Sequence, residues 1–268
     1  MTAGEVRYSM NYDVIIYIFL VLFGACVGSF LNVVIARLPN KGEFLSKKRS
    51  CCPLCEQEIK PYDLIPIFSW FVLRGKCRSC KARISFQYPL VEASGAFLAC
   101  FSFWRFGFDD VTGFSFVVVF AVAAVLLAIS LIDLDTTEIP NSLIISIAVC
   151  AIASIWVFPG ISLLSRAIGF VAVSIPLLTI TLAVNGAFGG GDIKLVAVCG
   201  FLLGWQLILL AFFLALIFGG TYAIFLMISG KRKRGEHMVF GPAICLGVAI
   251  SLFYGYEIIS WYTGLFMI

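Results

Sequence analysis

Two aspartates stand out in this sequence because each lies beside a long apolar segment. Asp133 follows the apolar residues 115–132, and Asp192 ends the glycine-rich residues 188–192, just before a further apolar segment. Acidic side chains at membrane depth are costly, so their presence there suggests a function. Two carboxyl groups that share a water-accessible crevice cannot easily both ionise, so one keeps its proton while the other activates water. Hydrolysis of a peptide bond requires that division of roles.

Each acid taken alone also has an ordinary explanation. Asp192 could cap the helix that follows it, and Asp135 could be a hydrated loop residue. The neighbours of Asp192 favour a site, because Gly189 and Gly191 allow the backbone to bend and to approach a partner closely. Lys194 could steady a carboxylate or extend its ammonium group to the membrane interface. We therefore expect these two glycines and this lysine to support the acid.

The sequence has few of the residues that other kinds of hydrolytic site require. His237 is the only histidine of the chain, which excludes a histidine-rich catalytic metal site and leaves little material for a serine or cysteine triad. The sequence therefore predicts Asp133 and Asp192 as a catalytic pair, brought to one face of the membrane by two different helices.

The ten cysteines fall into two groups. Five lie within apolar segments, where small hydrophobic side chains are expected. The other five lie within residues 51–80, and four of them form two C-x-x-C pairs with 21 residues between them: Cys52, Cys55, Cys77 and Cys80. Two disulfides or a redox dithiol are alternatives, but this spacing is typical of a structural zinc site with four thiolate ligands. Cys51 is out of step with the pairs and is not expected to be a ligand.

The elements that must position these residues are membrane helices. Of the 268 residues, 61% are hydrophobic and 13% are charged, and an apolar run of about 20 residues is what a helix needs to cross the hydrocarbon core. We predict an all-α polytopic membrane protein of about eight spans with a zinc-ribbon-like loop domain. The predicted spans are residues 12–36, 89–106, 115–132, 143–158, 166–184, 193–204, 206–229 and 239–266. The predicted domains are a first transmembrane helix (1–37), the zinc-binding loop domain (38–88) and a multi-helix peptidase domain (89–268).

Basic residues predict how the chain lies in the membrane. Residues 38–88 hold ten Lys and Arg against four Asp and Glu, and residues 231–234 are all basic. Short basic loops remain in the cytoplasm, so both segments are expected inside and the N-terminus outside. Asp133 and Asp192 then reach the cytoplasmic face. Because loop orientation accounts for the basic residues, we expect no nucleic-acid partner.

These residues together resemble the prepilin peptidase family of bacterial type IV pilus, type II secretion and competence systems. The resemblance extends from the first span to the last. It is carried by residues 28–39, both C-x-x-C pairs, residues 73–77, 84–85 and 88–92, Asp133 at its distance from residues 139–141, the G-x-G-D-x-K-L box at residues 189–195, and residues 240–242.

The resemblance implies that Asp133 and Asp192 are the catalytic pair of an intramembrane aspartyl peptidase of the bacterial inner membrane. Its substrates would be prepilins or pseudopilins, which lose a short basic leader just before their hydrophobic helix. Many members then methylate the new N-terminal amine with S-adenosylmethionine, and the sequence identifies no residue for that step. Three alternatives stay open: a peptidase without methyltransferase activity, a presenilin-like protease, and a transporter or assembly factor whose acids relay protons. Oligomeric state, the pilin and the machine served are not predicted.

Overall fold

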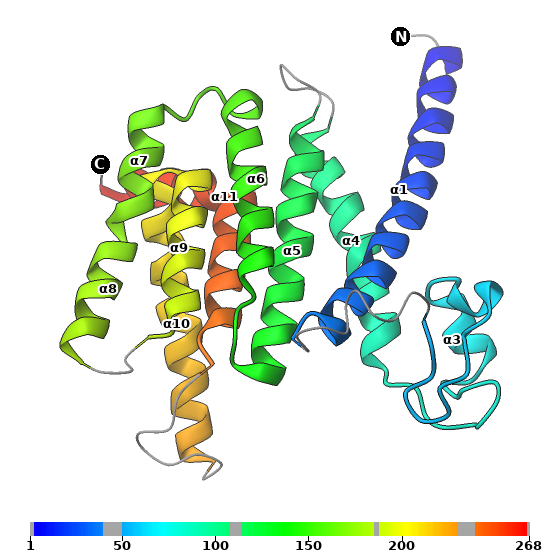
Figure 1. Cartoon of the computed structure of the whole chain (residues 1–268). Helices are drawn as coiled ribbons and strands as arrows, with labels where there is room; N and C mark the ends of the chain where they lie inside the picture. The colour runs from blue at the N-terminus through cyan, green and yellow to red at the C-terminus, as the bar shows by residue number, and fades with distance from the viewer. Residues whose placement is uncertain (1–2, 40–49, 108–113, 185–187, 230–238, 267–268) are drawn as a thin grey trace. The chain divides into compact units, whose positions relative to one another are not determined.

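A computed structural model describes residues 3–39, 50–107, 114–184, 188–229 and 239–266. Over these residues the chain is helical, and its only β-pairing consists of two isolated bridges in the loop domain. The predicted all-α class is therefore confirmed. The helices are α1 (Ala3–Arg37), η1 (Pro61–Leu64), α3 (Phe68–Val72), α4 (Gln87–Phe106), α5 (Ser115–Thr136), α6 (Asn141–Val157), α7 (Leu163–Ala172), α8 (Ser174–Ala183), α9 (Gly190–Leu203), α10 (Trp205–Ile228) and α11 (Gly241–Phe266) (Figure 1).

Several helices have the length and apolar composition of membrane spans. Within the described residues there are five, and α6 is a shorter apolar helix. The five are Asp13–Arg37, Ser115–Thr136, Leu163–Ala183, Trp205–Ile228 and Gly241–Leu265. The protein is therefore an integral membrane protein, while the count of eight spans stays a prediction. The predicted basic segment 231–234 and His237 lie outside the described residues.

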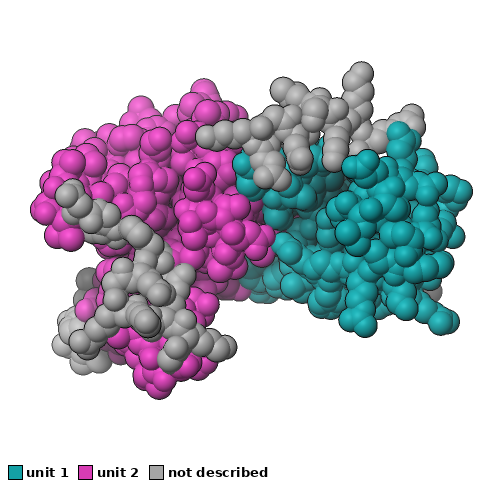
Figure 2. Space-filling view, turned by 60° about the horizontal axis from the view of Figure 1, so that its bottom comes forward, with its two compact units in different colours: residues 1–107 teal, residues 108–268 magenta. Residues whose placement is uncertain are grey.

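The chain forms two compact units, Met1–Gly107 and Phe108–Ile268 (Figure 2). The first contains α1, the loop domain and α4, and the second contains α5 to α11. The predicted division at residues 37 and 88 follows expected function and stays a prediction.

In the first unit, α1 and α4 pack backbone against backbone. A Cβ atom added to Gly28 would lie 2.6 Å from the Val91 carbonyl oxygen, and one added to Gly24 would collide with Gly95. One turn further along α1, the Asn32 amide donates a hydrogen bond of 3.0 Å to the Tyr88 carbonyl. Small residues four apart let membrane helices approach this closely.

In the second unit, half of the residues of α5 are buried. Its Val119, Val122 and Ala128 side chains have no exposed surface. This helix packs against α6 and α11, while α9 packs against α6, α7, α10 and α11 (Figure 1). The two helices that end or begin at the predicted aspartates, α5 and α9, are thus both anchored in the same bundle.

The predicted fifth span, residues 166–184, is broken into α7 and α8 at Val173. Pro176 explains the break, because proline has no N–H to donate to the carbonyl of Ala172, four residues earlier. The helix also starts before the prediction, at Leu163, because the Ser162 hydroxyl accepts a hydrogen bond from the Ser165 amide and so caps the first turn.

Arg166 joins the ends of three helices. Its guanidinium is fully buried and donates to the Ser154 hydroxyl (2.8 Å) and carbonyl (2.9 Å) on α6 and to the Leu202 carbonyl (3.1 Å) on α9. A further hydrogen bond of 3.1 Å reaches the Phe158 carbonyl. Carbonyls at helix C-termini have no partners within their own helix, so this one side chain provides charged donors to carbonyls such as that of Leu202 at the end of α9.

We expect Arg166→Met to destabilise the protein by about 3 kcal/mol or more, because several buried carbonyls lose charged donors at once. Thermal unfolding of the detergent-purified protein measures this, with the exposed Lys81→Met as control. Equal unfolding temperatures for wild type and Arg166→Met would contradict the structural role given to this residue.

Candidate active site and metal centre

Asp133 lies in the last turn of α5 and its side chain points into the bundle. The residue is 5% exposed, and its Oδ2 atom accepts a hydrogen bond of 3.1 Å from the Gly241 amide. Gly241 is the first residue of α11, and the first amides of a helix have no partner within it. Asp133 therefore caps a helix that begins 108 residues further along the chain. Asp135 is exposed, as expected for a residue about 200° further around the helix.

The end of α5 is fixed locally. Thr137 adopts a left-handed conformation, with φ of 57°, and its amide donates to the Asp133 carbonyl at 2.9 Å. This arrangement ends the helix within one turn of the acid. The extended residue Pro140 then leads directly into α6.

Asp192 occupies the first turn of α9, where its carboxylate accepts a hydrogen bond of 3.3 Å from the Gly189 amide. It therefore caps its own helix, as one reading of the sequence predicted. This hydrogen bond leaves acceptor positions of the carboxylate available, because an ionised carboxyl group can accept about four hydrogen bonds. Asp192 and Asp133 also lie within electrostatic reach of each other. The structure thus places both predicted acids at helix N-termini in one region.

Two contacts hold the glycine-rich turn against the chain that follows Asp133. A Cβ atom added to Gly191 would lie 2.9 Å from the Ile139 side chain, so only glycine fits without displacement. Lys194 donates from Nζ to the Asn141 side-chain oxygen at 3.2 Å. Lys194 thus ties α9 to the start of α6, a role that differs from both roles considered for it in the sequence.

The segment before α11 contacts both acid-bearing regions. The Phe240 ring meets the Phe188 ring edge to face, with centroids 5.7 Å apart, and Phe188 begins the turn that carries Asp192. The next residue, Gly241, binds Asp133, and a Cβ atom there would collide with that carboxylate. Sequence reasoning did not assign this role, since no spacing rule links Gly241 to Asp133. A Gly-Pro pair at a helix start was the one available signal.

The four predicted metal ligands lie together in the loop domain. The sulfur atoms of Cys52, Cys55, Cys77 and Cys80 are all within 4.8 Å of one another, and Cys52 and Cys80 are 3.8 Å apart. Tetrahedral Zn–S bonds of about 2.3 Å require sulfur atoms roughly 3.8 Å apart. The thiols therefore fit a metal ion of this size. Cys51 is outside the cluster, as predicted.

The two pairs are built alike, at a constant offset along the chain. The Cys52 amide donates to the Gln57 carbonyl (3.0 Å), and the Cys77 amide donates to the Ala82 carbonyl (2.8 Å). In each turn, backbone amides also point at the first sulfur. Those of Cys55 and Leu54 lower the pKa of the Cys52 thiol to about 6. The thiolate is the form that binds metal, so the backbone of both turns favours metal binding before a metal ion is present.

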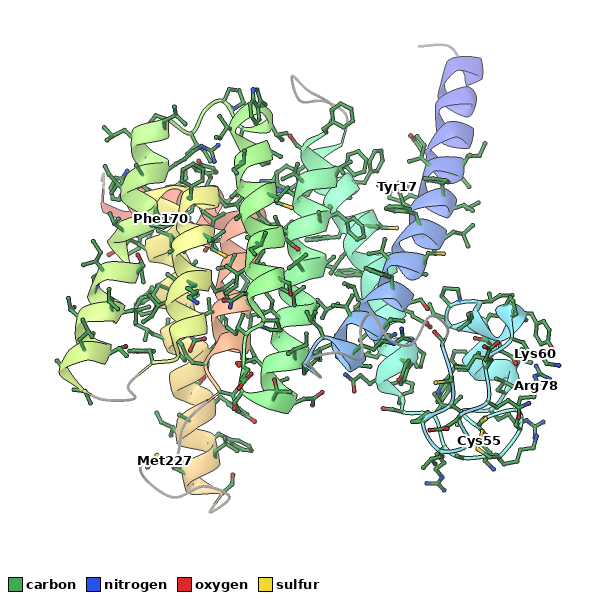
Figure 3. All side chains as sticks on the ribbon, viewed as in Figure 1. Tyr17, Cys55, Lys60, Arg78, Phe170 and Met227 are labelled. Carbon is green, nitrogen blue, oxygen red and sulfur yellow. The ribbon has the colours of Figure 1, made fainter. Side chains whose placement is uncertain are left out.

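An ion pair supports one of these turns. Arg78 donates to both carboxylate oxygens of Asp63, at 2.8 and 2.6 Å, and this guanidinium lowers the pKa of the Asp63 carboxyl. Arg78 and Lys60 also lie over the Tyr62 ring, 5.3 and 5.6 Å from its centroid. Figure 3 shows Lys60 and Arg78 with Cys55 in the loop domain. These contacts link η1 to the second C-x-x-C turn.

Comparison with known proteins gives matches over most of the chain. Residues 22–106 match the bacterial peptidase A24 N-terminal domain, and residues 119–224 match the type IV leader peptidase family. The prepilin leader peptidase/N-methyltransferase of Bacillus subtilis is 34% identical over 248 residues, which are 91% of this chain and 96% of that protein. The protein of the same name from Legionella pneumophila is 32% identical over 288 residues, covering 96% and 98% of the two chains. No solved structure matches significantly.

We expect Cys55→Ser to lose most of its bound metal, because three thiolates cannot close a structural tetrahedral site. Cys51→Ser is the matched control and should keep about one metal ion per chain. Elemental analysis of the purified variants by mass spectrometry measures both. If the two variants bind equal amounts of metal, the cluster is not the metal site.

Proposed function

The chain belongs to the type IV leader peptidase family, and we propose that Asp133 and Asp192 are the catalytic pair with which it acts. It cleaves the leader peptides of type IV prepilins and N-methylates the cleaved products. Family membership favours this activity over the transporter or assembly-factor alternative. The names of the relatives include methyl transfer, which a peptidase alone would lack.

The observation that supports the pair most directly is the convergence of three chain segments. The first turn of α9 carries Asp192, and the end of α5 carries Asp133. The start of α11 binds Asp133 through Gly241, and Phe240 contacts Phe188, just before α9. Among the described residues of the second unit, Asp133 is buried and Asp192 is half-buried, whereas the other acids, Asp135, Glu138 and Glu257, are exposed.

In the proposed mechanism the two carboxyls share one proton. The ionised carboxyl takes a proton from a water molecule, and the water oxygen attacks the carbonyl carbon of the scissile peptide bond. The protonated carboxyl donates to the carbonyl oxygen, and a proton then passes to the leaving nitrogen as the C–N bond breaks. The Gly241 and Gly189 amides hold the two carboxyl groups in fixed orientations, so little reorganisation is needed during the reaction.

The orientation of the protein in the membrane and its substrate are part of the same proposal. We propose that the protein lies in the bacterial inner membrane with its N-terminus outside, and that the loop domain and the aspartates reach the cytoplasmic face. Prepilins or pseudopilins bring a basic leader and a hydrophobic helix, and membrane lipid surrounds both chains. The cut falls where leader and helix meet, at the membrane surface, which is the depth of helix ends such as those that carry Asp133 and Asp192.

We propose zinc as the ion held by Cys52, Cys55, Cys77 and Cys80. Four thiolates close the coordination sphere and leave no position for water or substrate, so the role of the metal is structural. Within residues 50–86, the part of the loop domain that the structure describes, the helices are short and several aromatic residues are exposed. Small folds of this kind depend on such a site for stability. The methyl group for the second reaction comes from S-adenosylmethionine, as the methyltransferase names imply.

We expect Asp133→Asn and Asp192→Asn each to reduce prepilin cleavage by roughly 10²- to 10⁴-fold, the range for a lost proton-transfer group. Asparagine caps a helix about as well as aspartate, so these changes remove the acid and keep the helix ends. Asp135→Asn is the control and should cleave normally. The assay incubates the purified protein with a prepilin in detergent or liposomes, and normal cleavage by either variant would refute the assignment.

We expect Gly241→Ala to reduce cleavage on the order of 100-fold, because the added methyl group displaces the Asp133 carboxylate and small displacements at a reacting group are this costly. Gly220→Ala on α10 is the matched control, since a Cβ atom there meets nothing within 4 Å. The same prepilin assay compares the two. Equal rates would show that the contact between Gly241 and Asp133 does not position the acid.

A further inference from the structure

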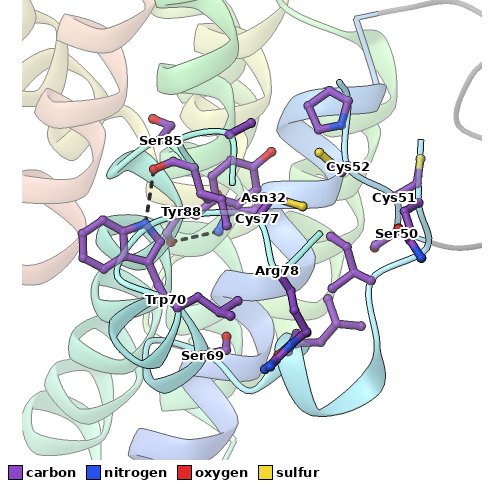
Figure 4. A pocket seen from close by; sticks show the side chains of 18 of the residues that line it. Asn32, Ser50, Cys51, Cys52, Ser69, Trp70, Cys77, Arg78, Ser85 and Tyr88 are labelled. Atoms are coloured by element: carbon purple, nitrogen blue, oxygen red, sulfur yellow. Dashed lines mark hydrogen bonds and ion pairs between the residues drawn. The ribbon is translucent and has the colours of Figure 1, made fainter. Parts of the chain in front are cut away.

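A cavity of about 560 Å³ lies within the first unit, between the loop domain, the last turns of α1 and the first turns of α4 (Figure 4). Its volume falls within the roughly 300–1,000 Å³ of small-molecule sites. The cavity is separate from the aspartates, which belong to the second unit. Nothing in the proposed peptidase mechanism uses it.

The walls of the cavity carry both signs of charge. Among its lining residues, Arg37, Lys60, Arg78 and Arg83 are basic, and Glu58, Asp63 and Glu92 are acidic. A basic leader peptide would be poorly matched to such a lining, because the cations would repel it. A small ligand that itself carries positive and negative groups fits better.

Glu92 is the acid of this set that comes from α4, and it is 8% exposed. Its Oε2 atom accepts a hydrogen bond of 2.6 Å from the Ile67 amide, and the Ser29 hydroxyl also binds the carboxylate. An ionised carboxylate offers about four acceptor positions, so acceptor capacity remains for a ligand. Burial of a carboxylate is costly unless a cation or donors compensate it.

Aromatic side chains complete the lining. Trp70 is held by a hydrogen bond of 3.3 Å from its indole nitrogen to the Ile84 carbonyl, and Tyr88 starts α4 beside Asn32, whose amide binds the Tyr88 carbonyl (Figure 4). Aromatic surfaces of this kind stack with planar rings and attract cations. The cavity therefore combines an aromatic wall, a buried carboxylate and basic side chains.

We propose that this cavity binds S-adenosylmethionine, with Glu92 facing its cationic sulfonium group. The inference rests on the methyl-transfer activity given under the proposed function. The ligand brings an adenine ring for the aromatic wall, a sulfonium and an ammonium group for the acids, and a carboxylate for the basic residues. In the transfer, the lone pair of the pilin amine forms the N–CH₃ bond while the C–S bond breaks and its electron pair stays on sulfur.

The position of the cavity also suits the methyl acceptor, the cleaved pilin. It lies where α1, a candidate membrane span, ends and where α4 begins. A cleaved pilin presents its new amine at the start of a hydrophobic helix, at the same boundary between membrane and water.

Direct binding of labelled S-adenosylmethionine to the purified full-length protein, without prepilin, tests this proposal. We expect Glu92→Gln to weaken binding by roughly tenfold or more, because a charged contact is lost. Glu56→Gln, a change of the same kind at an exposed loop-domain residue that does not line the cavity, should bind normally. Metal content and thermal unfolding of Glu92→Gln verify that the loop domain is intact. Wild-type affinity in Glu92→Gln would overturn the proposal.

A second measurement does not depend on any substitution. Ultraviolet cross-linking of the labelled donor to wild-type protein, followed by peptide mapping, should place the label within residues 29–106. Label confined to residues 114–266 would overturn the proposal. Prepilin cleavage by the same preparation is scored separately, so failure of the donor site can be distinguished from failure of the catalytic assignment.

Discussion

The hydrogen bond from the Gly241 amide to Asp133 is the interaction on which the second unit depends. An acid in an apolar bundle needs donors, and the unpaired first amide of α11 supplies one at 3.1 Å. Because α11 begins more than a hundred residues after Asp133, this bond requires α5 and α11 to be in place together. Asp192 also accepts a hydrogen bond from a backbone amide, but its donor, Gly189, is only three residues away in the sequence. The bundle is thus organised so that helix N-termini face the two acids.

The sequence predicted the residues of the site more fully than the contacts among them. Asp133 was preferred to Asp135 on its distance from residues 139–141, and the structure buries the first and exposes the second. The close packing of Gly24 and Gly28 against α4 fits their spacing of four residues along α1. The partnership of Gly241 with Asp133 and that of Lys194 with Asn141 were not predicted, because they join segments far apart in the sequence and no periodicity relates them.

The helix boundaries were also predicted less well than the residues of the site. Apolar composition identifies α7 and α8 as one stretch long enough to cross a membrane, and only the missing amide of Pro176 divides it. Composition likewise gave no sign that Arg166 would be fully buried, since its partners are main-chain carbonyls at the ends of other helices. Every residue has a main-chain carbonyl, so the pattern of side chains in the sequence does not indicate which carbonyls accept hydrogen bonds from a buried arginine.

The repeated construction of the two C-x-x-C turns has a consequence for assembly of the loop domain. Each turn supplies two of the four sulfur atoms, and the main-chain hydrogen bonds that shape each turn lie within it, so a bound metal ion would join two separate segments of the chain. Cys52 and Cys77 also line the cavity beside α4. A metal ion bound by the two turns would therefore also hold this wall of the cavity in place.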